Sequence, residues 1–530
     1  MTRDETSAGD SSFVPSAIEW LWLALLVGFS WHYFWLMDDS FIYYRYVDNL
    51  LFLGRGLVFN AGEYVEGYTS PAWLLLLVPF RALRLDYWTI VHGLSVAVAA
   101  TYGLLLVRLN RELSPPGSSA LNLPLAIAAG HYGITEHFSS GLETPLVQLW
   151  AVLVALWITR PRSRFLGVLV SLAPLVRPEL ALPALLCAAG VWISTRRVPL
   201  AFCLAGALAN GAWLAFRVYY YADFLPNTYY LKGQTNWMQG AWYLASGAVG
   251  QWWIWLIPAA WVVVLVVRRA RAHGELFARA LMVAAATAVL VWVAKVGGDM
   301  MYHRFLAFPT TLLLCSIAGV TEAVLATVRR PLLQQAALAA CGVVAFGLSL
   351  ASYPVTLVAH PLAGGTTRHW HAIDEAMWHR QHLDLALTPD KRGLDAQLQA
   401  RYAAITPAAR QQLDVLVHPW CRRAFFEYAK YMINSYGLTD SILAHIDVGF
   451  ARPGHKRTAG RAAELGKIVQ QTGAARGVGM YRRAVARHRA PRWVANNLTT
   501  IELIERKVYN RHRFFENLGL ALQPTGRIKL

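Results

Sequence analysis

Two adjacent carboxylates, Asp38 and Asp39, directly follow an apolar run that is long enough to cross a lipid bilayer. The stretch that contains them, MDDSFIYYRY, continues with aromatic side chains of the kind that settle at the membrane interface. Carboxylates held at that depth are partly desolvated, which raises their pKa and suits a general base. A solvated end of a span is the plain alternative for such a pair, but the aromatic continuation favours chemistry.

Two further stretches carry acids and a base between apolar runs. Residues 60–73, NAGEYVEGYTSPAW, contain Glu63 and Glu66, and LVRPEL contains Arg177 and Glu179 on either side of a proline. Ionisable groups beside hydrocarbon persist where they pair, line a wet cavity or work. An ion pair at a turn explains Arg177 and Glu179 as well as a substrate contact does.

Candidates for binding an anion lie in two later stretches. DFLPNTYYLKG contains Asn227 and Lys232, and GGDMMYHRF contains Asp299, His303 and Arg304 at the mouth of a span. A lone lysine in an interfacial loop often only extends its amine to water. His303 and Arg304 gain nothing from the positive-inside tendency on the outer side, so an anionic ligand such as a phosphate would explain them.

Composition indicates that these loops are carried by a membrane protein. The chain has 530 residues, of which 56% are hydrophobic and only 15% are charged. The first apolar run lacks a small-residue cleavage pattern, so we expect it to be retained and not removed as a signal peptide. About eleven spans are predicted, at 17–36, 88–107, 121–134, 144–159, 165–176, 180–194, 198–219, 247–267, 278–296, 305–327 and 332–353.

The topology follows from the positive-inside tendency. With 71–85 as an interfacial helix, the arginine-rich loops at 108–111, 160–164, 196–197, 268–271 and 329–330 all fall on one side, which is therefore cytoplasmic. The N-terminus is then cytoplasmic, and the candidate loops face outward. We expect a polytopic α-helical membrane domain over 1–353 and an extracytoplasmic mixed α/β domain over 354–530, with amphipathic stretches at 394–402, 410–417 and 422–432.

Charge and motifs restrict the partners. The formal net charge is +18, and the tail from residue 353 holds 26 Lys and Arg against 13 Asp and Glu, which favours an anionic membrane surface or a polyanionic polymer. Nucleic acid is not expected, because no nucleic-acid motif accompanies the basic tail. No nucleotide-binding or paired-cysteine zinc motif is present, and four of the five cysteines lie in apolar segments, so neither a nucleotide cofactor nor a disulfide framework is expected.

The ordered set of motifs resembles a known family. MDDSFIYYRY, NAGEYVEGYTSPAW, SGLET with Glu143, LVRPE, LPNTYYLK and GGDMMYHRF are similar to stretches of the GT-C superfamily of polytopic glycosyltransferases. More narrowly, the set resembles the actinobacterial terminal arabinofuranosyltransferases of cell-wall arabinan. The tail strings YGLTDSILAHID, residues 436–447, and RPGHK, residues 452–456, resemble the extracytoplasmic domain of the same group.

This resemblance implies a GT-C-like fold in the cytoplasmic membrane, a decaprenyl-phosphoryl arabinofuranose donor and an arabinan acceptor in the cell wall. By the family's pattern, Asp38 is the base that takes the acceptor hydroxyl proton, and Asp39 orients it, binds sugar hydroxyls or holds a cation. The leaving lipid phosphate needs charge stabilisation, for which Lys232, His303 and Arg304 are suitable. The expected residues for binding substrate or donor phosphate are Glu63, Glu66, Glu143, Arg177, Glu179, Asn227, Lys232, Asp299, His303 and Arg304.

Several alternatives stay open at this point. A divalent cation is possible, and no fixed ligand spacing decides for or against it. The transferred sugar could be another lipid-phosphate pentose or hexose. A transporter or a non-catalytic scaffold of wall assembly is the competing class, although no internal repeat of the kind that transporters show is visible.

Overall fold

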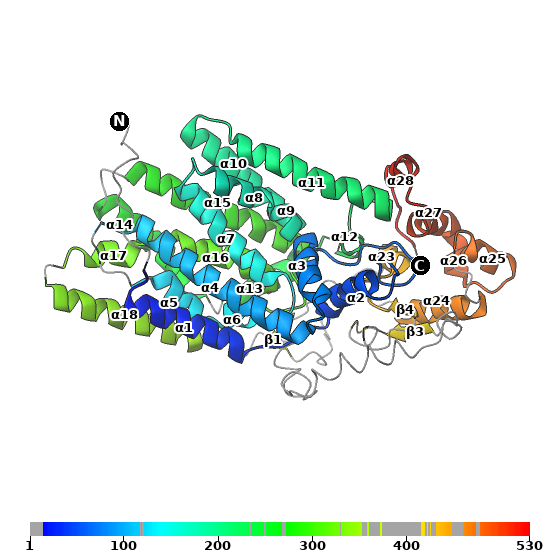
Figure 1. Ribbon diagram of the computed structural model, residues 1–530, viewed down its shortest axis with the longest axis horizontal. Helices are drawn as coiled ribbons and strands as arrows, with labels where there is room; N and C mark the ends of the chain where they lie inside the picture. The colour runs from blue at the N-terminus through cyan, green and yellow to red at the C-terminus, as the bar shows by residue number, and fades with distance from the viewer. Residues whose placement is uncertain are drawn as a thin grey trace.

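The computed structural model describes residues 14–351, apart from 117, 119–120, 233–234, 249–250, 268–271 and 329, and residues 431–529, apart from 448–458 and 473–476. Between these parts it describes 358–359, 372–373, 415–418, 421 and 425. The N-terminal part is a bundle of helices, and the C-terminal helices lie beyond one end of that bundle (Figure 1).

The bundle is that of a polytopic helical membrane protein, as the composition predicts. Six helical segments of the described chain are long and apolar enough to span a membrane. They are α4 (Tyr87–Leu113), η1 with α10 (Pro178–Leu180, Ala181–Thr195), α11 (Leu200–Tyr221), α15 (Ala272–Val296), η4 with α16 and α17 (Arg304–Leu306, Ala307–Ser316, Val320–Leu325) and α18 (Pro331–Ala351).

Other apolar helices are shorter or bent. α13 (Trp237–Ala248) and the pair η2 (Trp252–Trp255) and α14 (Leu256–Val267) meet at 92° and would add one span if they cross together. The shorter apolar helices are α1 (Ala17–His32), α3 (Pro71–Ala82), α7 (Thr144–Thr159) and the pair α8 (Arg164–Ser171) and α9 (Ala173–Val176). Helix length therefore does not decide the predicted number of eleven spans, which stays a prediction.

Two segments differ from their sequence-based description. The predicted span at 121–134 forms two short helices, α5 (Leu123–Gly130) and α6 (Tyr132–His137), which are each too short to cross a bilayer and meet at His131. The stretch after Asp39, expected as an interfacial loop, is a helix, α2 (Ser40–Leu51). It is buried on all sides over its first ten residues, because the surrounding loops and helices cover it.

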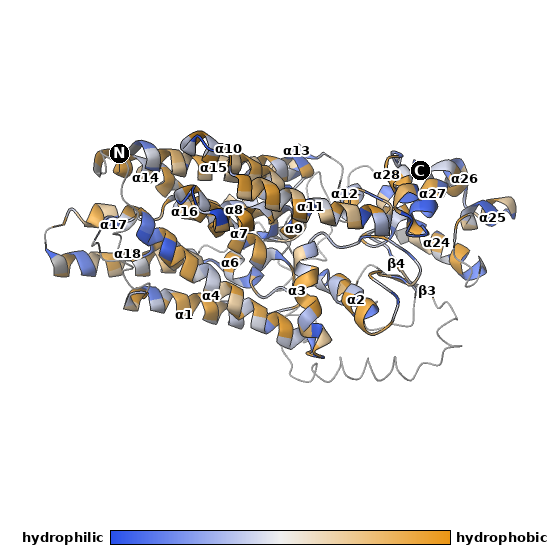
Figure 2. Cartoon of the chain, turned by 45° about the horizontal axis from the view of Figure 1, so that its top comes forward, coloured by the Kyte–Doolittle hydropathy of each residue, from blue (hydrophilic) through white to orange (hydrophobic). Residues whose placement is uncertain are grey.

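Burial distinguishes the centre of the bundle from its lipid-facing rim. In the η4–α16–α17 segment 78% of the apolar window is buried, whereas in α11 only 11% is buried. Hydrophobic residues cover the bundle helices in Figure 2, including α11. An apolar helix that is hardly buried by protein needs lipid around it, so α11 lies at the rim.

The described C-terminal residues form two pairs of short parallel strands and a group of helices. β1 (Val358–Ala359) pairs with β2 (Ala372–Ile373), and β3 (Val415–His418) pairs with β4 (Tyr431–Asn434). The helices are α23 (Ser441–His445), α24 (Ala459–Thr472), α25 (Met480–Ala486), α26 (Arg492–Asn496), α27 (Leu498–Val508) and α28 (Phe514–Ala521).

These helices, apart from α28, share a hydrophobic core with β4, which includes Ile433, Leu465 and Ile504 and also takes in Val65 of the loop between α2 and α3. The predicted amphipathic stretch at 394–402 lies outside the described residues, the end of 410–417 is strand β3, and the end of 422–432 begins β4. The predicted C-terminal domain and its boundary at 354 stay a prediction.

Hydrogen bonds join the C-terminal segment to the loop between α2 and α3. Asn60 Nδ2 donates to the Met432 carbonyl at 2.8 Å, and the Tyr64 amide donates to the Val508 carbonyl at 2.9 Å. Beside that loop, α12 (Asn227–Lys232) contributes Asn227, whose Nδ2 donates to the carbonyl of Gly437 at 2.9 Å. We call this contact zone the seam.

Candidate functional site

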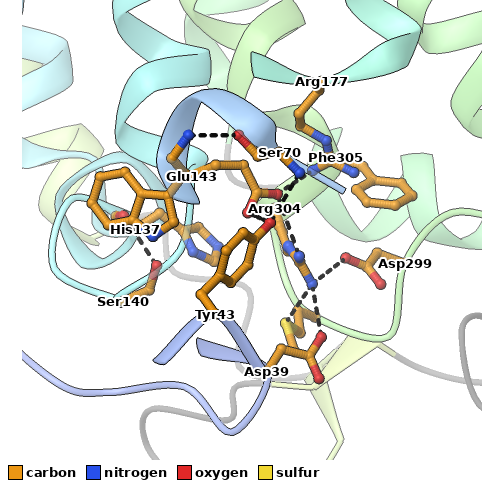
Figure 3. A network of polar contacts seen from close by, with 12 residues as sticks. Asp39, Tyr43, Ser70, His137, Ser140, Glu143, Arg177, Asp299, Arg304 and Phe305 are labelled. Carbon is orange, nitrogen blue, oxygen red and sulfur yellow. Dashed lines mark hydrogen bonds and ion pairs between the residues drawn. The ribbon is translucent and has the colours of Figure 1, made fainter. Parts of the chain in front are cut away.

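Arg304 stands at the centre of a buried charged cluster (Figure 3). Its Nη1 lies 3.3 Å from Asp39 Oδ2 and 3.6 Å from Asp299 Oδ2, and its Nη2 lies 3.4 Å from Glu143 Oε1. The three carboxylates come from segments far apart in the sequence, namely the start of α2, the start of α7 and the turn before η4. Because one guanidinium serves all three, Arg304 fixes their relative positions.

Two glycines shape the turn that carries Asp299 and Arg304. Gly297 and Gly298 have φ of +87° and +74°, which side chains other than glycine rarely adopt. A Cβ on Gly298 would lie 2.3 Å from the Tyr243 ring. The turn therefore needs glycine at this position both for its backbone conformation and for its close packing.

Arg177 extends the cluster. Its Nη1 lies 3.4 Å from Glu143 Oε1, its Nε lies 2.6 Å from Glu179 Oε1, and its guanidinium lies 4.5 Å from the centre of the Phe305 ring. The sequence left open whether Arg177 and Glu179 simply pair. They do pair, and Glu143 connects this pair to Arg304.

Glu143 is ionised in this setting. Burial alone would raise its pKa, but the guanidiniums of Arg304 and Arg177 outweigh burial and hold the pKa below its ordinary value. The Tyr43 hydroxyl also donates to Glu143 Oε2 at 3.2 Å and accepts from the Ser70 amide at 3.1 Å. The cluster thus holds four acids and two bases. The acids are Asp39, Glu143, Glu179 and Asp299, and the bases are Arg177 and Arg304.

Asp38 and Asp39 point to different partners. Asp39 pairs with Arg304, whereas Asp38 Oδ2 accepts a hydrogen bond of 2.8 Å from the backbone amide of Cys421. The Cys421 thiol is buried and accepts from Asn434 Nδ2 at 3.3 Å. Burial, together with the neighbouring Asp38 and Asp39 charges, raises the pKa of this thiol, so it is protonated at pH 7.

His303 directly precedes Arg304 in the chain but is not a cation. It is fully buried, with φ of +62°, and its ring lies against His131 with 4.9 Å between ring centres. Burial lowers the pKa of His303 well below its ordinary value, so the side chain is neutral at pH 7 and cannot supply the expected positive charge. Gly133 makes room for it, because a Cβ there would lie 2.5 Å from His303 Cγ.

Three predicted site residues lie at the seam instead of in the Arg304 cluster. Glu66 pairs with Arg217, with 3.1 Å between Oε1 and Nη2. Glu63 accepts hydrogen bonds from the hydroxyls of Tyr431 and Tyr509 at 2.6 and 2.7 Å, and Asn227 bonds backbone carbonyls of the C-terminal segment. The Lys232 side chain lies outside the described residues.

Sequence reasoning missed several contributors. Tyr43 stands one helical turn after Asp39, and that i, i+4 spacing on α2 could have indicated that both face one site. Nothing in the sequence pointed to Cys421, whose backbone alone makes the contact, or to Arg217, which reads as the polar end of a span.

The acids of the cluster are paired with arginines and are not grouped as metal ligands. Among the described residues, no three His, Cys, Asp or Glu side chains are grouped so that they could hold a metal ion. Asp39 and Asp299, which would be natural cation ligands, both face the Arg304 guanidinium, so a protein cation lies between them.

Comparison with known proteins confirms the resemblance seen in the motifs. The chain is 35% identical over 262 residues to a terminal beta-(1->2)-arabinofuranosyltransferase of Mycobacterium tuberculosis, covering 43% of this chain and 40% of the relative. It is 28% identical over 343 residues to the protein of the same name from Corynebacterium glutamicum, covering 54% of this chain and 48% of the relative. No protein-family model matches the chain, and no solved structure matches it significantly.

The matched segments thus span less than half the length of either relative. The bundle of apolar helices indicates a membrane-embedded protein. The chain is a helical membrane protein that resembles actinobacterial terminal arabinofuranosyltransferases.

Proposed function

We propose that the protein is a membrane glycosyltransferase that moves D-arabinofuranose from a polyprenyl-phosphate donor to an arabinan acceptor on the outer face of the cytoplasmic membrane. The observation that carries the proposal is the Arg304 cluster, which joins Asp39, the neighbour of Asp38, through Arg304 and Glu143 to a second arginine, Arg177. The similarity to two arabinofuranosyltransferases supports the choice of sugar.

The chemistry requires a base and a partner for the leaving phosphate. The acceptor hydroxyl oxygen forms a bond to the anomeric carbon, the bond from that carbon to the phosphate oxygen breaks, and the hydroxyl proton passes to a carboxylate. The proposed base is Asp38, as the resemblance implies. Asp39 faces the Arg304 guanidinium, and a carboxylate that is paired with a guanidinium is a weaker base. The backbone amide of Cys421 orients Asp38 by donating a hydrogen bond to its Oδ2.

Arg304 and Arg177 suit the phosphate. Guanidinium groups recognise phosphate through two parallel N–H donors, and they need no proton transfer to stabilise the charge that develops on the leaving oxygen. Both arginines are buried, and Glu143 lies within ion-pair distance of each and orients them before a donor arrives. Neutral His303 supports the turn before Arg304 by packing and does not contribute charge.

The test uses the full chain in nanodiscs with radiolabelled decaprenyl-phosphoryl arabinose and a short arabinan acceptor. We expect labelled, lengthened acceptor from the wild type and a loss of about 10³-fold or more for Asp38→Asn, which cannot accept the proton. Asp86→Asn is the matched control, because Asp86 caps α4 and asparagine caps a helix equally well.

Three outcomes distinguish the alternatives. Transfer of another lipid-linked pentose or hexose, but not of arabinose, would keep the enzyme and replace the sugar. Movement of the donor across the bilayer without a change of its bonds would indicate a transporter. An Asp38→Asn variant that retains full function in cells would favour a non-catalytic scaffold.

A further inference from the structure

The helix α28 leaves a row of large apolar side chains uncovered. Phe515 is 85% exposed, and Leu522, which directly follows the helix, is 67% exposed. Phe514 at the start of the helix is exposed as well. Single exposed apolar residues are common on protein surfaces, but several of them side by side indicate a surface that binds a partner.

These apolar side chains share one face of the helix. At 3.6 residues per turn, they fall within an arc of about 100° that contains Phe514, Phe515, Leu518 and Leu522. Asn517 and Ala521 are buried beside that arc, and Glu516 is exposed on the side of the helix away from it. The helix is therefore amphipathic, with one side against the protein, one polar side and one apolar side without protein on it in the described structure.

Polar contacts fix α28 and the residues before it on the end of α11. Asn517 Nδ2 donates to the Tyr219 carbonyl at 2.7 Å, and Asn510 Nδ2 donates to the Tyr220 carbonyl at 3.1 Å. The His512 ring stacks on the Tyr220 ring, with 4.7 Å between the ring centres. In Figure 1, α28 lies next to this end of α11. The place of α28 is thus set by contacts that leave its apolar face open.

The helix α11 shows where the bilayer ends. It is the least buried of the six span candidates in the described residues, so lipid covers it. Exposed leucines run along it at Leu200, Leu204 and Leu208. Its 22 residues are about 33 Å long, which matches a hydrocarbon core of about 30 Å, and its last turn carries Tyr219, Tyr220 and Tyr221. Because tyrosine is enriched at membrane–water interfaces, this turn and α28 beside it lie at the level of the lipid headgroups.

Charge favours a lipid surface as the partner. Arg511 and Arg513, which are both exposed, directly precede α28, and Arg506 is exposed near the end of α27. Basic side chains next to an apolar helix face are typical of helices that lie in the interface of an anionic bilayer. A stable protein partner would need a much larger surface, since such interfaces take about 20–30 residues on each side.

We infer that α28 is a membrane-surface helix, whose apolar face lies in the phospholipid headgroup region of the bilayer that holds the bundle. That face continues the lipid-covered surface of α11. Because α28 packs against α27, and the Val508 carbonyl of α27 accepts from the Tyr64 amide, this membrane contact also holds the seam at the bilayer surface. The inference does not depend on the proposed transfer reaction.

The experiment measures the depth of single nitroxide labels on the full chain in nanodiscs of phosphatidylcholine and phosphatidylglycerol. Cys203→Ala and Cys341→Ala first remove the exposed thiols. Phe515→Cys then places the label on the apolar face of α28, and Glu516→Cys places it on the polar face. Oxygen dissolves in lipid whereas a nickel chelate stays in water, so the ratio of their collision rates with the label reports its depth. We expect this ratio to be at least about threefold higher at 515 than at 516.

Val478→Cys is the matched control for the label. Val478 is also an exposed apolar residue, but it stands just before α25, on the side of the C-terminal helices away from the bundle (Figure 1). Its label should meet the nickel chelate freely. Labels at 515 and 516 that both meet the chelate as freely as the label at 478 would overturn the inference. A label at 515 that is shielded from both reagents would also overturn it, since a protein partner or a second copy of the chain would then cover this face.

A second measurement uses the chain without labels. Amide hydrogen exchange of residues 511–523 in the nanodisc reports how firmly α28 is held. We expect Phe515→Asp combined with Leu522→Asp to speed this exchange about tenfold, because carboxylates are disfavoured beside lipid. Val478→Asp should leave the exchange of 511–523 unchanged. Equal exchange in the double variant and the wild type would contradict the membrane contact.

Discussion

The backbone amide of Cys421 donates a 2.8 Å hydrogen bond to Asp38, a residue 383 positions earlier in the chain. The proposed base is therefore positioned by a segment that belongs to the C-terminal part of the chain. This contact ties the predicted extracytoplasmic domain to the candidate site.

The amide of Cys421, and not its thiol, makes this contact. Replacing the Cys421 side chain should therefore affect the transfer activity less than removing its backbone N–H. We expect Cys421→Ala to retain at least about half of the transfer activity, and Cys421→Pro, which lacks the N–H, to lose about 10²-fold. Transfer rates in nanodiscs check this prediction, with thermal unfolding as the control for folding. Equal activity of the two variants would contradict it.

Arg304→Lys keeps a positive charge but not the planar fork that contacts Asp39, Glu143 and Asp299. We expect a loss of about 10²-fold or more in kcat/KM for the lipid donor, since the site needs two directed donors at once. Arg108→Lys, at a half-exposed pair on α4, is the matched control. A lysine variant with normal donor kinetics would show that Arg304 only fills space.

Tyr43→Phe removes the hydroxyl that bridges Ser70 and Glu143. We expect a decrease in the free energy of unfolding of about 1 kcal/mol and a severalfold slower transfer, because Glu143 then loses one of the groups that orient it. Tyr229→Phe, on an exposed side chain of α12, should change neither quantity. The measurements are chemical unfolding in detergent and single-turnover transfer.

The seam should make stability depend on pH. Asp440 and Glu505 have ordinary pKa values near 4, which burial raises to about 7 in the folded chain. A raised carboxyl pKa means that the folded state holds protons that the unfolded state has released. Stability is then greatest below about pH 4 for these two groups and decreases as the pH rises to about 7.

The substitution Glu505→Gln should remove part of the decrease in stability that occurs as the pH rises from about 4 to about 7. We expect the Tm of the variant at pH 8 to exceed that of the wild type by about 2–4 °C, and the difference to shrink at pH 5. Tryptophan fluorescence during heating checks it. A Tm difference that does not depend on pH would mean that Glu505 is ionised in the folded chain.

Most members of the charged cluster were predicted as site residues from the sequence alone. Six of the predicted residues come together, because each stands at the end of an apolar segment and such ends share one level in a bundle. They are Asp39, Glu143, Arg177, Glu179, Asp299 and Arg304. Glu63 and Asn227 contact the C-terminal segment instead, and Glu66 pairs with Arg217 of α11. A loop position fixes the side of the membrane and not the neighbour across it.

The sequence by itself determined that this is a helical membrane protein, which loops carry its polar residues, and which family it resembles. Hydrophobic runs and ordered motifs are local properties, so they can be read without coordinates. Only the tertiary structure decided that Asp38 and Asp39 turn to different partners, that His303 is neutral, and that Glu63 binds two tyrosines of the C-terminal segment. Those properties depend on burial and on contacts between distant segments, and packing alone sets both.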